Sequence, residues 1–137
     1  MHKLKARLQD ESKSTLMAKK ILIIDDEHDI CEVLAEYLRE SGYDARYECD
    51  GKKGLELIGQ FRPNLLILDI RMPGMDGFEV LKGIVRQFPS LIVIVYTGVD
   101  QQETKDKALR YGACEYVTKP TSPQKLREDY ILPILGE

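Results

Sequence analysis

The sequence lacks the signatures of a disulfide-bonded or zinc-binding protein. Its 137 residues include three cysteines, an odd number, and no CxxC pair. Cys31, Cys49 and Cys114 each lie in a stretch with the pattern of a regular element, where cysteines are commonly buried thiols. We therefore expect reduced core thiols, which are typical of a cytoplasmic protein.

Long hydrophobic runs are also absent. The longest apolar run, residues 91–96, is far shorter than the roughly 20 residues of a membrane-spanning helix. The basic N-terminal stretch is not followed by the apolar segment of a secretory signal. These absences predict a cytoplasmic protein that does not contact a membrane.

The charge of the whole chain is nearly balanced. A net charge of −3 favours neither nucleic-acid binding nor a disordered acidic chain, and 43% hydrophobic residues are enough for a buried core. The balance is uneven, because residues 1–20 hold six Lys or Arg against two acids. We predict a basic tail or linker over residues 1–18 and one domain over residues 19–137.

Apolar runs and amphipathic stretches alternate along the predicted domain. The runs predict strands at residues 21–24, 43–49, 65–68, 91–95 and 114–118. Helical spacing over 30–38, 51–61, 78–85 and 101–111, and the Ser122-Pro123 pair that opens a last helix, predict five helices. Pro133 is expected to end or kink that last helix after Leu132. Strict alternation predicts an α/β fold, a doubly wound five-stranded parallel sheet with five helices.

Polar residues with complementary chemistry follow four of the predicted strands. Asp25 and Asp26 follow the first, Asp69 the third, Thr97 the fourth and Lys119 the fifth. In open parallel sheets these ends meet at the edge where ligands bind. Oxygen ligands without His or Cys suit Mg²⁺, and a carboxylate beside Mg²⁺ can attack a phosphoryl group. Each residue alone has an ordinary structural explanation, and it is their coincidence that favours a site.

The motifs around these residues resemble the receiver domains of two-component response regulators, the CheY-like superfamily. Residues 69–77 match the D-x-x-M-P-x-M-D-G signature, and Asp25-Asp26, Thr97-Gly98, Gly112-Ala113, Tyr116 and Lys119-Pro120 match the other family positions. The resemblance covers about residues 19–132. It implies a flavodoxin-like sheet with strand order 2-1-3-4-5 and a Lys119-Pro120 peptide in the cis form.

The resemblance also implies a role for each matching residue at the site. Asp69 is the expected phosphoacceptor, and Lys119 is expected to pair with the phosphoryl group. Asp25, Asp26, Asp69 and the backbone carbonyl of Arg71 are the expected Mg²⁺ ligands. The family receives its phosphoryl group from a sensor histidine kinase, a histidine phosphotransfer protein or a small acyl phosphate. The chain is then not an enzyme but a signalling phosphoacceptor that assists its own phosphorylation and dephosphorylation.

The family's switch implies a second set of roles. Thr97 is expected to move toward the attached phosphoryl group, and Tyr116 to turn inward as it does. The change would be read on the surface of the fourth helix, fifth strand and fifth helix. An output domain or target protein would lie outside this chain, which ends at Glu137, and no contact with nucleic acid is predicted within it.

Three residues depart from the family's usual pattern. Arg71 and Val99 stand two residues after Asp69 and Thr97, at positions that flank the phosphoryl group and affect its lifetime. We expect modest autodephosphorylation from this pair, because a long cation can shield the group and valine cannot bind an attacking water. Thr121 stands where the family usually has a large apolar residue.

Three alternative functions are open to the sequence. An Mg²⁺-dependent phosphohydrolase with an aspartyl-phosphate intermediate usually needs a second acid two residues after the nucleophile, where this chain has Arg71. A flavodoxin-like module for a nucleotide or flavin needs a phosphate-binding loop after the first strand, where Asp25, Asp26 and Glu27 repel phosphate. A degenerate receiver that serves only as an interaction surface disagrees with the intact acceptor residues.

Overall fold

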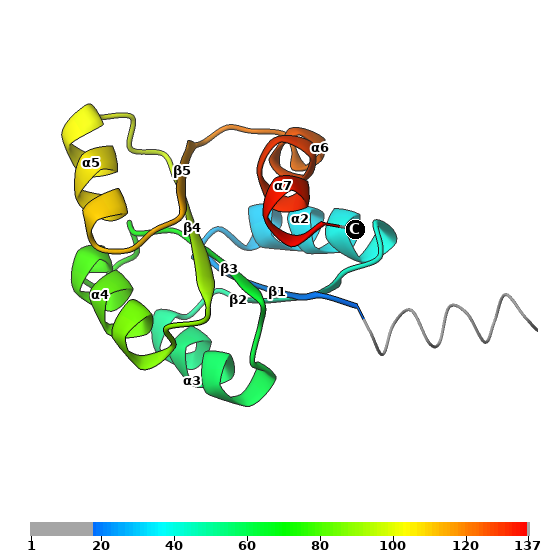
Figure 1. Ribbon diagram of the computed structural model, residues 1–137, viewed down its shortest axis with the longest axis horizontal. Coiled ribbons are helices and arrows are strands. Elements are labelled where there is room, and N and C mark those ends of the chain that lie inside the picture. The colour runs from blue at the N-terminus through cyan, green and yellow to red at the C-terminus, as the bar shows by residue number, and fades with distance from the viewer. Residues whose placement is uncertain (1–17, 137) are drawn as a thin grey trace, which may run out of the picture.

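The computed structural model describes residues 18–136, so the predicted basic tail lies almost wholly outside the described residues. Five parallel strands form one sheet in the order β2-β1-β3-β4-β5 (Figure 1). The strands are β1 (Lys20–Ile24), β2 (Asp44–Glu48), β3 (Leu65–Leu68), β4 (Ile92–Thr97) and β5 (Glu115–Thr118). The predicted fold class and strand order are confirmed.

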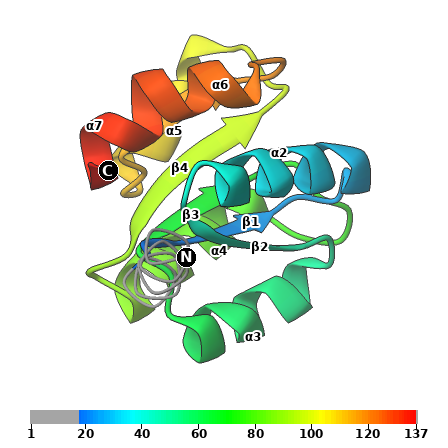
Figure 2. The same cartoon turned by 90° about the vertical axis from the view of Figure 1, so that its right-hand side faces the viewer.

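Helices cover both faces of the sheet. They are α2 (His28–Glu40), α3 (Gly51–Phe61), α4 (Gly77–Gln87), α5 (Gln102–Arg110) and a last helix in three consecutive segments, α6 (Pro123–Leu126), η1 (Arg127–Ile131) and α7 (Leu132–Leu135). The α2 helix and the last helix lie on one face, and α3, α4 and α5 lie on the other (Figures 1 and 2).

The central strands β1 and β3 are buried on both faces, as their unbroken apolar runs predict. Side chains alternate between the faces, so Ile21 and Ile23 pack with α2 and the last helix. Leu22 and Ile24 pack instead with residues of α3 and α4. Such strands require a helical layer on each side, and this arrangement leaves the carboxyl edge of the sheet free to carry polar groups.

The prediction that all three cysteines are core thiols is wrong for one of them. Cys114 is exposed, whereas Cys31 is buried and Cys49 is half-buried. Cys114 lies outside the core because β5 starts one residue later, at Glu115, and only its backbone N–H joins the sheet, by donating to the Val93 carbonyl.

Pro133 does not end the last helix after Leu132. Helical backbone continues to Leu135, and a π-helical turn over Arg127–Ile131 precedes the proline. In this turn the N–H of Leu132 donates to the carbonyl of Arg127, five residues back. A proline lacks the N–H of a normal helical bond, and its ring collides with the carbonyl four residues back. A wider π turn is a local adjustment that lets the helix continue past it.

The start of α4 is packed tightly against the residue that follows Asp69. The side chain of Asp76 caps this helix by accepting hydrogen bonds from the N–H groups of Phe78 and Glu79. A Cβ atom on Gly77 would lie 2.0 Å from the carbonyl oxygen of Ile70, so only glycine fits there. The Asp76-Gly77 pair of the motif thus has a local role in the packing beside Asp69.

Candidate functional site

The carboxyl ends of β1, β3 and β5 bring three of the predicted site residues into contact. Asp25 and Asp69 directly follow β1 and β3, and the N–H of Asp69 donates to the Ile24 carbonyl at 3.0 Å. Lys119 directly follows β5. Its Nζ lies 2.6 Å from Asp25 Oδ2 and 3.0 Å from Asp69 Oδ2. Asp25 and Lys119, which are 94 positions apart in the sequence, therefore lie in contact. Their places at the ends of parallel strands predict this.

Lys119 is held charged at this point. Its side chain is only 9% exposed. Burial lowers the pKa of Lys119. The hydrogen bonds to Asp25 and Asp69 and the charges of both carboxylates together raise it by more, so its pKa lies above the usual value. A third carboxylate also contacts the ammonium, because Nζ lies 3.1 Å from Glu27 Oε1.

Backbone N–H groups fix the two buried carboxylates. Asp25 Oδ1 accepts a hydrogen bond from the N–H of Glu27 at 3.0 Å, and Asp69 Oδ1 accepts one from the N–H of Arg71 at 2.8 Å. Burial raises the pKa of Asp25, and its hydrogen bonds to Lys119 and Glu27 only partly oppose this rise. Asp25 is therefore a carboxylate whose charge is costly unless a cation is near.

Three carboxylates are close enough to share a cation. Oxygen atoms of Asp25, Glu27 and Asp69 all lie within 4.8 Å of one another. From the sequence, Glu27 is only one of the acids after the first strand, with no predicted part in the site. Glu27 is the N-cap of α2, but its side chain makes no capping hydrogen bond and reaches Lys119 instead. Asp26 is exposed, and its predicted part in binding Mg²⁺ stays a prediction, as does that of the Arg71 carbonyl.

The hydroxyl of Thr97 is a buried polar group without a partner among the described residues. Thr97 is the last residue of β4 and is 0% exposed, and its Oγ1 makes no hydrogen bond. Leaving such a group unsatisfied costs about 1–3 kcal/mol. Its backbone is tied to the site, since the N–H of Lys119 donates to the Thr97 carbonyl at 2.8 Å.

Tyr116 is turned inward in the structure. Its ring is buried against residues of the α4 and α5 side, and its hydroxyl donates to the Val99 carbonyl. Burial raises the pKa of Tyr116, with smaller contributions from Asp100 and Asp69. The predicted inward movement of this ring stays a prediction. The Lys119-Pro120 peptide is cis, as the resemblance implies.

An apolar groove adjoins the site on the α2 side. This cavity of about 350 Å³ is lined by Ile30, Val33 and Leu34 of α2 and by Pro120 and Pro123 beyond β5, with Lys119 at its edge. Val33 is 58% exposed. The groove thus offers a hydrophobic surface next to the Lys119 ammonium.

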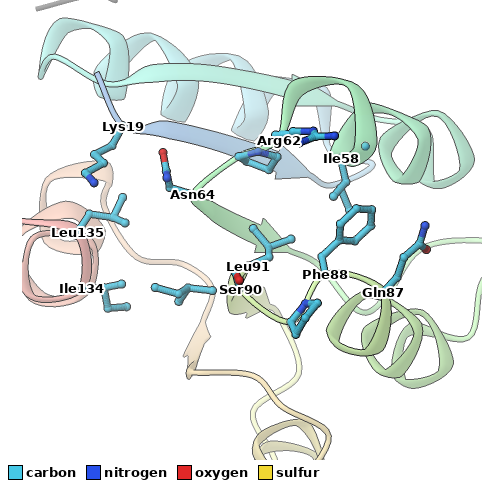
Figure 3. Close-up of a pocket in the computed structure, with 14 residues that line it drawn as sticks. Lys19, Ile58, Arg62, Asn64, Gln87, Phe88, Ser90, Leu91, Ile134 and Leu135 are labelled. Atoms are coloured by element: carbon cyan, nitrogen blue, oxygen red, sulfur yellow. The ribbon is translucent and has the colours of Figure 1, made fainter. Parts of the chain in front are cut away.

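A second cavity of about 730 Å³ lies at the opposite, amino-terminal edge of the sheet (Figure 3). Lys19, Asn64 and Leu91 line it from the starts of β1, β3 and β4, and Ile134 and Leu135 line it from the last helix. Among the described residues its lining contains no acidic side chain, so this lining differs in charge from the edge that holds Asp69. Within residues 18–136 no helix has the length and apolar character to cross a membrane.

Comparisons with known proteins agree on one family. The model of the response regulator receiver domain matches residues 21–130. A CheY-like receiver domain protein from Methanospirillum hungatei JF-1 is 31% identical, with a TM-score of 0.79 over 85% of this chain and 94% of its own. Chemotaxis protein CheY4 of Vibrio cholerae is 27% identical, with a TM-score of 0.79 over 86% and 99%.

A third solved structure carries a modified site. It is a Burkholderia pseudomallei response regulator with a phosphorylated aspartic acid, a calcium ion and citrate. This protein is 26% identical to the present chain, with a TM-score of 0.75 over 85% of this chain and 66% of its own.

Proposed function

The chain belongs to the response regulator receiver domain family, and from this premise we propose that Asp69 accepts a phosphoryl group in a two-component signalling system. The observation that carries the proposal is the set of contacts around Lys119, which joins the carboxylates of Asp25 and Asp69 at 2.6 and 3.0 Å. The phosphorylated aspartate of the Burkholderia pseudomallei protein supports the same chemistry.

The transfer step uses the Asp69 carboxylate as the nucleophile. One oxygen forms a bond to phosphorus while the bond from phosphorus to the donor, a histidine nitrogen or an acyl oxygen, breaks with its electron pair. Lys119 leaves its ion pair with Asp69 and contacts the phosphoryl oxygens, which carry the charge that the carboxylate loses. The N–H of Arg71 holds the other Asp69 oxygen at 2.8 Å, so the nucleophile is oriented before the donor arrives.

The donor set at this edge fits Mg²⁺. Three carboxylate oxygens within 4.8 Å of one another form a hard, oxygen-only group of the kind this ion prefers. Asp25 and Asp69 would hold it, with Asp26 and the Arg71 carbonyl as the further ligands that the family resemblance implies. When bound, Mg²⁺ neutralises charge on the phosphoryl oxygens, which otherwise meet an edge with more carboxylates than cations.

Thr97 and Tyr116 are the proposed switch. The unpaired Thr97 hydroxyl gains a hydrogen-bond acceptor when phosphoryl oxygens are attached to Asp69. A contact made in only one state shifts a two-state equilibrium. Tyr116 lies in β5, so we place the readout on the surface of α5, β5 and α6, the elements that correspond to the predicted fourth helix, fifth strand and fifth helix.

The partner that donates the phosphoryl group is proposed to be a sensor histidine kinase or a histidine phosphotransfer protein. The apolar groove beside Lys119 is the surface on which we place it, because a partner seated there holds its histidine near Asp69. The modest autodephosphorylation predicted from Arg71 and Val99 stays a prediction, and a phosphoryl half-life of seconds would contradict it.

A mass measurement tests the proposed function. The protein is incubated with Mg²⁺ and a small acyl phosphate, and intact mass is expected to show one phosphoryl adduct that is lost in base. A chelator added before the acyl phosphate is expected to prevent the adduct. Steady turnover of unrelated phosphate esters would instead favour a phosphohydrolase.

A further inference from the structure

Tyr96, the residue before Thr97 in β4, ties down the loop that carries Lys119. Its hydroxyl donates to the Thr121 carbonyl at 2.9 Å and accepts from the Thr121 N–H at 3.1 Å. Tyr96 is 4% exposed, and the two bonds are partly shielded from water, which strengthens them. The N–H of Lys119 also donates to the Thr97 carbonyl. The last two residues of β4 therefore anchor the loop on both sides of Pro120.

The ring of Tyr96 also lies beneath the ammonium itself. Lys119 Nζ is 5.5 Å from the ring centroid, within the range of a cation–π interaction. Side chains of neighbouring strand residues point to opposite faces, so Tyr96 packs on the α2 side with the core of that face. The same ring lines the apolar groove. Tyr96 and Lys119 therefore line the groove together, and the ring contacts the ammonium there.

On the premise of the proposed function, we infer that Tyr96 is a positioning residue for Lys119 during phosphoryl transfer. Thr121 cannot fix this loop through a large side chain, and its own hydroxyl is used locally, donating to the Thr118 carbonyl at 2.9 Å. The aromatic ring that holds the loop is supplied instead from β4. Tyr96 reaches the Asp69 carboxylate through Lys119, whose Nζ lies over the Tyr96 ring and 3.0 Å from Asp69 Oδ2.

The test compares Tyr96→Phe, which removes only the hydroxyl, with Tyr43→Phe as a matched control. Tyr43 is a buried tyrosine of the same core whose hydroxyl donates to the Gly136 carbonyl. With acetyl phosphate, Tyr96→Phe is expected to form the Asp69 adduct about tenfold more slowly, since small displacements of a catalytic group cost large factors in rate. The Mg²⁺ affinity, measured by calorimetry, is expected to stay unchanged. Tyr43→Phe is expected to keep the wild-type rate.

A rate for Tyr96→Phe equal to that of the wild type would overturn the inference, as would an equal loss in Tyr43→Phe. If the wild type forms no adduct, the proposed function fails and a second measurement decides on Tyr96. In the wild type, NMR is expected to show slow hydrogen exchange of the Thr121 amide and contacts between Lys119 methylene protons and the Tyr96 ring. This measurement needs no variant to fold. A rapidly exchanging Thr121 amide without those contacts would contradict the positioning role.

Discussion

Lys119 brings one positive charge to three carboxylates, and this imbalance explains much of the site's chemistry. Its Nζ contacts Asp25, Asp69 and Glu27 at 2.6 to 3.1 Å. Because like charges in a buried site raise one another's pKa, the site is set to accept a further cation. A phosphoryl donor, itself an anion, is then met by a less negative edge.

The buried carboxyl of Asp25 gives a pH-dependent prediction for the metal-free protein. Burial raises its pKa above the ordinary value of 3.8, so the native state binds protons that the unfolded chain has released. The unfolding free energy should therefore fall as pH rises from about 4 through the native pKa. In Asp25→Asn, urea unfolding with a chelator present is expected to lose this fall, whereas Asp26→Asn, at an exposed neighbour, should keep it. Identical pH profiles for wild type and Asp25→Asn would contradict the assignment.

The unpaired hydroxyl of Thr97 predicts that its removal stabilises the protein, whereas most substitutions in a protein core lower the free energy of unfolding. Thr97→Val removes a buried, unsatisfied polar atom at nearly constant volume, so the unphosphorylated protein is expected to gain about 1 kcal/mol in unfolding free energy. Thr121→Val is the matched control, since the Thr121 hydroxyl has a partner and its loss should destabilise. A clear loss of stability in Thr97→Val would show that its hydroxyl is already bonded.

Asp25, Asp69, Thr97 and Lys119 could be predicted from the sequence because strand order alone brings their backbones to one edge. The contacts between side chains could not be predicted in this way. Glu27 reaches Lys119 only because its side chain leaves the cap of α2. The bonds between Tyr96 and Thr121 join residues 25 positions apart and depend on how the loop packs, which no local pattern encodes.

At the scale of elements, the start of α4 fixes the backbone beside Asp69. The Asp76 cap and the close approach of Gly77 to the Ile70 carbonyl hold the chain that leaves Asp69. Because α4 is packed closely against the end of β3, the short segment between them is held in place. The Arg71 N–H in this segment donates to Asp69 Oδ1. The motif of residues 69–77 therefore contributes to packing, through Asp76 and Gly77, as well as to the chemistry of the site.

Substitution of two glycines in α4 tests this packing. Gly77→Ala would place a methyl group 2.0 Å from a backbone oxygen, and because backbone cannot simply turn aside we expect a loss of about 1–3 kcal/mol. Gly83→Ala, in the same helix with open space around it, is expected to gain about 0.5–1 kcal/mol. Thermal unfolding of the two variants checks both signs, and equal effects would refute the steric explanation.

Long apolar runs predicted the central elements well, because β1 and β3 are buried on both faces. The elements at the edge of the sheet and the end of the chain were harder. The β5 strand begins one residue later than predicted and exposes Cys114, since an edge strand has weaker demands on burial. The last helix passes Pro133 by means of a π turn, an adjustment that depends on the packing of Ile131 and Leu126 in the core.

At the scale of the whole molecule, the carboxyl and amino edges of the sheet differ in the charge of the residues that they carry. The carboxyl edge carries the acidic cluster, Lys119 and the adjoining apolar groove, while the amino edge carries a larger cavity without acidic lining (Figure 3). The proposed chemistry and the proposed partner surface thus lie together on one side. The β4 strand connects them, because it ends at Thr97 beside β5, where Thr97 pairs with Thr118, and its Tyr96 lines the groove.

Phosphorylation of Asp69 is the central claim, and one comparison tests it most directly. Wild type, Asp69→Asn and Asp76→Asn are treated together with Mg²⁺ and acetyl phosphate, and their intact masses are measured. Asp76 is a matched control because it belongs to the same motif but caps α4. We predict one phosphoryl adduct on wild type and Asp76→Asn and none on Asp69→Asn. An adduct that persists in Asp69→Asn would contradict the assignment of the acceptor.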